Sequence, residues 1–163
     1  MKKRRLVIAI DVGDTLLDRT KKTVLMKNGH DKTYELFDGA MEALELFAER
    51  GHKLVVVSKV SHGAETRVMH YLEHHHIVPR LIKRRDVHFC YEREIKAPIA
   101  QSFGVDVIVD DRVQVHNEMQ KFGIKGILFL GGHDDRKEYK LTADVLEARN
   151  WLEVVGHINN LSQ

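Results

Sequence analysis

The sequence predicts a single α/β domain, with a parallel sheet between two layers of helices in a three-layer, Rossmann-like arrangement. Short apolar runs rich in β-branched residues recur along the chain, and amphipathic segments separate them. Runs that are apolar at every position are typical of strands buried on both faces of a parallel sheet. The regular alternation of strands and helices favours a doubly wound sheet with right-handed crossovers.

The predicted strands and helices can be placed in order. Strands are expected at Leu6–Ile10, Leu54–Val57, Val105–Val109 and Ile127–Leu130, with a weaker one at Val87–Cys90. Helices are expected at Ala40–Arg50, Thr66–His76, Lys96–Phe103, Val113–Phe122 and Thr142–Val155. Gly51, Gly104 and Gly123 follow three of these helices, where glycine commonly ends a helix. We expect Thr142 to cap the last one.

The segment of about residues 20–37 interrupts this alternation. Val24-Leu25-Met26 and Tyr34-Glu35-Leu36 are strand-like, and Asn28-Gly29 lies between them. Asn-Gly between two such pieces is a strong signal for a tight hairpin turn. We therefore expect a small β-hairpin flap over the carboxyl end of the first strand.

Composition limits the class of protein. A chain of 163 residues, 43% of them hydrophobic, can form one core, so we expect residues 1–163 to be one domain. Cys90 is the only cysteine, which excludes an internal disulfide and favours the cytoplasm. The basic start Met1–Arg5 precedes a short apolar run that ends in Asp11, which favours a strand over a signal peptide. No segment is long enough to cross a bilayer, and the net charge of +2 does not indicate nucleic acid.

Chemically useful side chains fall at the ends of predicted strands or at a helix start. They are Asp11, Ser58, Lys96 and the pair Asp110-Asp111. Because ligands bind at the carboxyl ends of the strands in such sheets, we expect these groups to meet. A carboxylate can attack phosphorus, and a hydroxyl at a helix start and a lysine can hold phosphoryl oxygens. Paired carboxylates are ligands suited to Mg²⁺.

In this order the residues resemble the motifs of the haloacid dehalogenase superfamily, most of whose members are Mg²⁺-dependent phosphatases. The matching stretches are Asp11…Thr15-Leu16, Val55-Val56-Val57-Ser58, Lys96 and Val109-Asp110-Asp111. The resemblance covers roughly Leu6 to Leu130. A two-component receiver domain uses similar residues, but there the acidic pair comes early and the lysine last, so the order here favours the first family.

The resemblance implies a role for each matching position. Asp11 would be the nucleophile that forms an aspartyl-phosphate. The implied magnesium ligands are Asp11, the carbonyl of Gly13, Asp110 and Asp111. The implied contacts to a phosphorylated substrate come from Thr15, Ser58, Lys59 and Lys96.

The first motif departs from the family pattern. The family usually has Asp-x-Asp-Gly-Thr, and the second aspartate protonates the leaving group and then activates water. Here Gly13 stands at that position and Asp14 stands where glycine is expected. Glycine can offer its carbonyl to a metal but cannot donate a proton, so Asp14 becomes the candidate catalytic acid if its side chain reaches the site. Loss of a positioned acid typically lowers rates by on the order of 10²–10⁴-fold, most for alkyl leaving groups.

Two functions of different class follow. The first is a capless hydrolase, whose open site suits a small or macromolecular phosphoester or a subunit partner, such as a second copy of the chain. The second, motivated by Gly13, is a non-catalytic protein that keeps the phosphate and metal pocket for binding or assembly. Binding of nucleic acid through Lys83-Arg84-Arg85 is a distant third.

Overall fold

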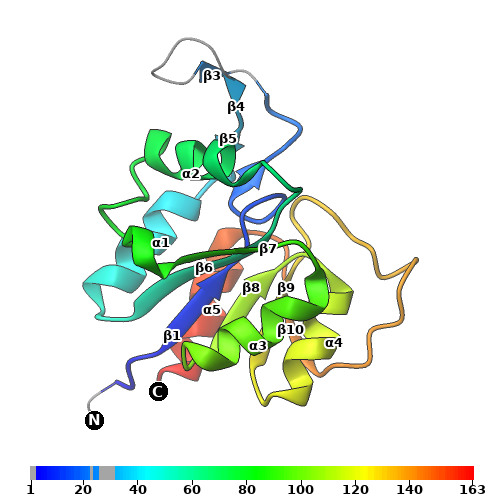
Figure 1. Ribbon diagram of the computed structural model, residues 1–163. Helices are drawn as coiled ribbons and strands as arrows, with labels where there is room; N and C mark the ends of the chain where they lie inside the picture. The colour runs from blue at the N-terminus through cyan, green and yellow to red at the C-terminus, as the bar shows by residue number, and fades with distance from the viewer. Residues whose placement is uncertain (1–2, 23, 26–31) are drawn as a thin grey trace.

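The computed structural model describes residues 3–22, 24–25 and 32–163, and it confirms the α/β fold. Six parallel strands form the central sheet in the order β10-β9-β8-β1-β6-β7 (Figure 1). The strands are β1 (Val7–Ile10), β6 (Lys53–Lys59), β7 (Val87–Cys90), β8 (Val107–Asp110), β9 (Lys125–Phe129) and β10 (Val145–Ala148). The weak strand expected at Val87–Cys90 is therefore present, beside β6.

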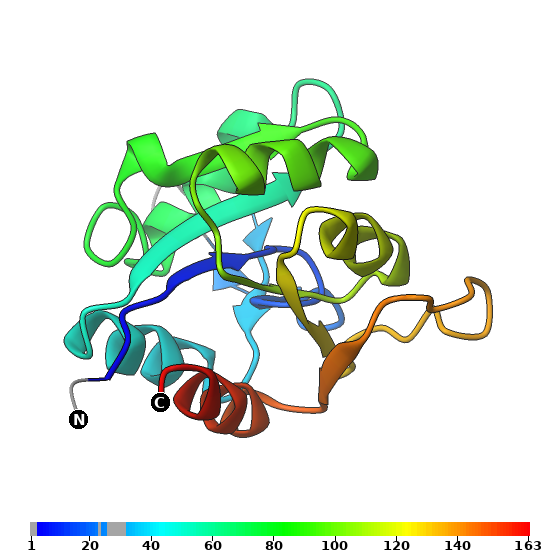
Figure 2. The same ribbon diagram turned by 90° about the horizontal axis from the view of Figure 1, so that it is seen from below.

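Helices cover both faces of this sheet. They are α1 (Ala40–Glu49), α2 (Glu65–His74), α3 (Lys96–Ser102), α4 (Val113–Lys121) and α5 (Trp151–Leu161), with short 3₁₀ turns η1 (Arg84–Asp86) and η2 (Arg93–Ile95). Seen along the sheet, α1 and α5 lie on one side, and α3 and α4 lie on the other (Figure 2). The three-layer arrangement is thus the one that the alternating pattern predicts.

The two faces of β1 show why its run is apolar throughout. Ile8 and Ile10 pack in the core cluster that contains α1 and α5, whereas Ala9 packs in the cluster with α3 and α4. All three are fully buried. Because successive side chains of a strand point to opposite faces, a strand between two helical layers has no polar side.

The prediction of a helix at Thr142–Val155 is wrong. Val145–Ala148 forms the edge strand β10, paired in parallel with Gly126–Phe129 of β9, and α5 begins only at Trp151. Asn150, not Thr142, is the N-cap: its Oδ1 accepts a hydrogen bond from the Glu153 amide at 2.9 Å. Ala, Leu and Glu favour helices, but pairing with β9 outweighs that weak preference here.

Short antiparallel pairs occupy the segment between β1 and α1. Strand β2 (Leu17–Asp18) pairs with β5 (Glu35–Leu36), and β3 (Val24–Leu25) pairs with β4 (Lys32–Thr33). They extend beyond the carboxyl end of β1, where the flap is expected (Figure 1), but the expected pairing is wrong in one respect: Glu35–Leu36 pairs with Leu17–Asp18 and not with Val24–Leu25. The expected Asn28-Gly29 turn lies outside the described residues. No described helix is both long enough and apolar enough to span a membrane.

Candidate active site

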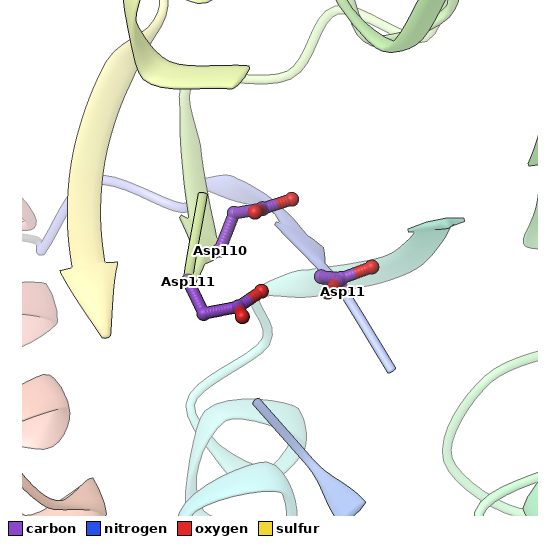
Figure 3. Close-up of side chains that lie close together, drawn as sticks. All are labelled: Asp11, Asp110 and Asp111. Atoms are coloured by element: carbon purple, nitrogen blue, oxygen red, sulfur yellow. The ribbon is translucent and has the colours of Figure 1, made fainter. Parts of the chain in front are cut away.

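Three carboxylates meet at the carboxyl ends of the two central strands. Asp11 directly follows β1, Asp110 ends β8, and Asp111 comes next (Figure 3). One oxygen from each side chain lies within 4.8 Å of the others. All three residues are buried, with exposed fractions of 6%, 0% and 1%. The amide of Asp11 donates to the carbonyl of Val109 at 3.0 Å, which continues the sheet pairing to the site.

Lys96 provides the positive charge between two of these groups. It is the first residue of α3, and its Nζ lies 2.9 Å from Asp11 Oδ1 and 2.7 Å from Asp110 Oδ2. Burial disfavours the charged ammonium, but the attraction of Asp11 and Asp110 outweighs it, so the pKa of Lys96 is raised. The lysine is therefore a permanent cation of the site.

The site nevertheless holds more carboxyl groups than Lys96 can balance when all of them are ionised. Burial and the neighbouring Asp11 and Asp110 raise the pKa of Asp111 to about 9. Burial likewise raises the pKa of Asp11, against the opposing effect of Lys96. Asp111 Oδ2 is buried and accepts no hydrogen bond from any described residue; Arg112 Nε lies 3.5 Å away. Three hard oxygen donors, one of them a buried carboxylate oxygen that accepts no hydrogen bond from the described residues, fit a divalent cation such as Mg²⁺.

A cavity of about 730 Å³ opens over this cluster. Its walls include Asp11, Gly13 and Lys96 together with Ser58 and Lys59 from the end of β6. Ser58 is buried and Lys59 is exposed. The structure therefore brings Ser58, Lys59 and Lys96, three of the four residues expected to bind a phosphoryl group, to the cavity that contains the expected nucleophile.

The side chain of Asp14 is engaged elsewhere. Its backbone is left-handed, with φ 57°, and its Oδ2 accepts hydrogen bonds from Arg19 Nε at 3.0 Å and Nη2 at 2.5 Å. Asp14 is not among the described residues that line the cavity, whereas Gly13 and Arg19 are. A Cβ atom at Gly13 would meet the Arg19 guanidinium at 3.6 Å. Arg19 thus covers the space beside Gly13, and Asp14 holds it there.

Thr15 lies behind the site. It is fully buried, and its Oγ1 has no hydrogen-bond partner among the described residues. Its carbonyl accepts a hydrogen bond from Trp151 Nε1 at 3.0 Å. Thr15 does not belong to the described cavity wall. These contacts connect α5 to the loop that carries Gly13 and Asp14.

Sequence reasoning missed three charged residues that support the site. Arg112 lines the cavity, lies near Asp111, and donates its amide to Asp110 Oδ1 at 2.9 Å. Asp135, fully buried, accepts from the Val113 amide at the start of α4. The position of Arg112, directly after Asp110-Asp111, was an available signal. No sequence signal indicated Arg19 or Asp135, because the positions of these two residues depend on the paths of their loops.

Comparison with known proteins identifies the fold. No protein-family model matches the chain, and no curated protein matches its sequence. Among solved structures, the D,D-heptose 1,7-bisphosphate phosphatase from B. bronchiseptica, complexed with magnesium and phosphate, has a TM-score of 0.69 at 13% identity, covering 96% of this chain and 99% of that one. The corresponding enzyme from Burkholderia thailandensis has a TM-score of 0.62 at 17% identity, covering 98% and 100%.

A haloacid dehalogenase-superfamily hydrolase from Ehrlichia chaffeensis gives a TM-score of 0.66 at 13% identity, covering 98% of this chain and 99% of that chain. The chain therefore has the fold of the haloacid dehalogenase superfamily, as the sequence motifs indicated. At these identities the comparison establishes the fold, and the chemistry has to be argued from the residues.

Proposed function

We propose that the protein is a Mg²⁺-dependent phosphohydrolase that works through an aspartyl-phosphate at Asp11. The observation that carries the proposal is the cluster of Asp11, Asp110 and Asp111 around Lys96 at the base of an open cavity. A structural ion pair needs one carboxylate for each cation, whereas this buried site has three carboxylates for Lys96 and the Arg112 guanidinium, which lies 3.5 Å from Asp111. The excess charge supports a site built for a cation and a phosphoryl group.

The side chains divide the work as follows. Asp11 attacks phosphorus, and Ser58, Lys59 and Lys96 hold the phosphoryl oxygens. The ligands for the metal would be Asp11, the carbonyl of Gly13, Asp110 and Asp111. When bound, Mg²⁺ offsets charge that develops on the phosphoryl oxygens. Water then hydrolyses the aspartyl-phosphate and regenerates Asp11.

Asp14 has a positioning role in this proposal. A carboxylate that accepts two hydrogen bonds from Arg19 is held as an acceptor and is unsuited to protonate a leaving group. We place Asp14 as the residue that orients Arg19, and Thr15 as a buried support of the same loop.

The buried Cys90, which forms no disulfide, is consistent with a reducing cytoplasm.

The direct test is hydrolysis of p-nitrophenyl phosphate with Mg²⁺, by the wild type and by Asp11→Asn. We expect the variant to lose at least about 10²-fold in kcat, because the amide is not a nucleophile. Excess EDTA should abolish the same activity. Asp144→Asn is the matched control, since the Asp144 side chain is 92% exposed.

The competing function is binding without catalysis, which Gly13 and the Arg19–Asp14 pair favour. Equal background rates for wild type and Asp11→Asn, with Mg²⁺ and phosphate still binding by calorimetry, would establish it over the hydrolase.

A further inference from the structure

We propose that the substrate is a phosphoanhydride, in which the group that leaves phosphorus is itself a phosphate. This inference rests on the proposed phosphoryl transfer to Asp11 and specifies its substrate. Two features carry it: the charge of the cavity wall, and the absence, among the described residues that line it, of a histidine or of any carboxyl group besides Asp11 and Asp111.

The described residues that line the cavity carry more positive charge than negative charge, and the excess is larger than the net charge of the whole chain. Seven of the described residues that line it are Lys or Arg and two are Asp, whereas the whole chain has a net charge of +2. Lys96 lies at the base against Asp11. The other six are Arg19, Lys22, Lys59, Arg67, Arg93 and Arg112. Within the described parts of the chain, no carboxylate pairs with Lys22, Lys59 or Arg67.

These cations outnumber what one phosphoryl group can use. A phosphoryl group beside Asp11 is met by Ser58, Lys59 and Lys96, and it fills a small part of a cavity of about 730 Å³. The remaining cations therefore face the rest of the substrate. A second anionic group on the leaving side matches them in charge, and guanidinium groups bind phosphate with paired hydrogen bonds.

The described part of the wall also offers no histidine and no spare carboxyl group to protonate the leaving group. The described lining contains no histidine and no carboxyl group except Asp11 and Asp111, both of which the proposed reaction uses. Beside Gly13 stands the Arg19 guanidinium, fixed by Asp14. A guanidinium does not give up its proton, but it stabilises an oxygen that leaves with negative charge. A phosphate leaves readily in that form, and an alkoxide does not.

The reaction balances without an added proton donor. A carboxylate oxygen of Asp11 forms a bond to phosphorus, and the bridging P–O bond breaks with its electron pair on the departing phosphate, which stays anionic beside Arg19. Water then attacks the same phosphorus, the bond to Asp11 breaks, and the carboxylate is restored. The hydrogens of the water end on inorganic phosphate and in the solvent.

The test compares kcat/KM for pyrophosphate, ADP, p-nitrophenyl phosphate and glycerol phosphate. We expect at least one phosphoanhydride to exceed glycerol phosphate by about 10²-fold or more, the size of a missing general acid. Arg19→Ala should lower kcat/KM for that phosphoanhydride at least tenfold more than for p-nitrophenyl phosphate, whose leaving group is a single phenolate. Arg19→Lys should restore part of the loss. Arg80→Ala is the matched control, because Arg80 is 50% exposed, close to the 52% of Arg19, and pairs with a carboxylate, Glu45, away from the cavity.

A binding measurement gives an independent readout. In the Asp11→Asn background, Arg19→Ala should weaken pyrophosphate at least fivefold and leave orthophosphate nearly unchanged, by calorimetry with Mg²⁺. Hydrolysis of p-nitrophenyl phosphate that needs Asp11, with no preference for either phosphoanhydride or no selective effect of Arg19→Ala, would overturn this inference and leave the hydrolase standing. Absence of any hydrolysis that needs Asp11 would overturn both.

Discussion

Lys96 neutralises part of a buried acidic cluster, with its Nζ between Asp11 and Asp110. Its side chain is 3% exposed, so water contributes little to balancing the charges around it. Removing one partner of a buried ion pair leaves an uncompensated charge, which is far more costly than losing a surface pair.

Lys96→Met should therefore destabilise the protein by about 3–5 kcal/mol without divalent ions. Mg²⁺ should recover part of that loss, because a cation that binds only the folded state stabilises it. Urea unfolding with and without Mg²⁺ measures both effects. Lys121→Met, which removes a 65% exposed lysine paired to Glu118, should change stability by less than about 0.5 kcal/mol. Equal losses in the two variants would contradict this account of the site.

Gly13 and Asp14 occupy exchanged positions with different backbone demands. Asp14 has φ 57°, a left-handed conformation that suits glycine better than most residues. Gly13 lies outside that region, and a Cβ there would make ordinary contact, at 3.6 Å, with Arg19. The backbone can thus accept the usual order of the two residue types without strain.

We expect the double variant Gly13→Asp, Asp14→Gly to raise kcat/KM for glycerol phosphate at least tenfold. The reason is that a carboxyl group then lines the cavity where a leaving alkoxide needs a proton, an effect worth on the order of 10²–10⁴-fold when fully realised. Gly156→Asp, at an open position on α5, should leave the rate unchanged. An unchanged rate in the double variant would show that the missing acid is not what limits alkyl esters.

At the scale of elements, the start of α5 has local and long-range functions. Asn150 caps the helix through the Glu153 amide, and Glu153 Oε2 accepts in turn from the Arg149 amide at 2.7 Å. Trp151 follows at once, fully buried, and donates to the Thr15 carbonyl behind the site. The N-cap therefore helps to position the Trp151 side chain against the loop that follows β1.

Asn150→Ala should lower the free energy of unfolding by about 1 kcal/mol, the usual effect of losing an N-cap. Urea denaturation monitored by Trp151 fluorescence is a suitable measurement, because Trp151 is the only tryptophan. In Asn160→Ala, on the exposed side of the same helix, stability should stay the same or rise slightly, since alanine is the better helix former. A stable Asn150→Ala variant would argue against the capping role.

At the scale of the whole molecule, buried histidines make stability depend on pH. Burial lowers the pKa of His52 and of His116. His52 Nδ1 accepts a hydrogen bond from the Leu6 amide at 3.0 Å, which a protonated ring could not do. His116 Nε2 donates to the Asp110 carbonyl, and its Nδ1 has no partner within the described chain.

Stability should therefore fall as the pH drops below about 6.5, the ordinary pKa of histidine in an unfolded chain. Below about pH 6.5 the unfolded chain binds protons that the folded protein does not, so acid favours unfolding. Above that pH the contribution of the histidines to the free energy of unfolding is constant. Each histidine adds a slope of at most about 1.4 kcal/mol per pH unit. Urea unfolding at pH 7.5 and 5.5 tests this.

His52→Asn is the informative variant, because its amide oxygen can replace Nδ1 as acceptor without titrating. It should show a smaller loss of stability between the two pH values than the wild type. A larger or equal loss would mean that His52 does not contribute to the acid sensitivity.

The strands could be predicted and the last helix could not, for identifiable reasons. Ile8, Val56 and Val109 lie in runs that are apolar throughout, and strands buried on both faces allow no other pattern. Val145–Ala148 is an edge strand with an exposed Glu147, so its residues resemble an amphipathic helix. The signal that was available, Asn150 followed by Glu153, is a typical start of a helix.

The candidate site divides in the same way. Asp11, Ser58 and Asp110 are parts of strands or follow them directly, so their positions follow from the order of the strands. Arg19 lies in a loop, and its contact with Asp14 depends on the path of that loop and on a left-handed backbone that no local pattern signals.

The sequence by itself determined the layered sheet, the strand ends at which the carboxylates gather, and the absence of an acid two residues after Asp11. These follow from short-range rules, since burial dictates apolar runs and parallel strands share one carboxyl edge. Only the tertiary structure decided that Arg19 covers Gly13, that Asp14 turns away to hold it, and that β10 joins the sheet. The Arg19–Asp14 contact depends on the path of a loop, and an edge strand takes its partner from another segment, so both depend on the packing of the whole molecule.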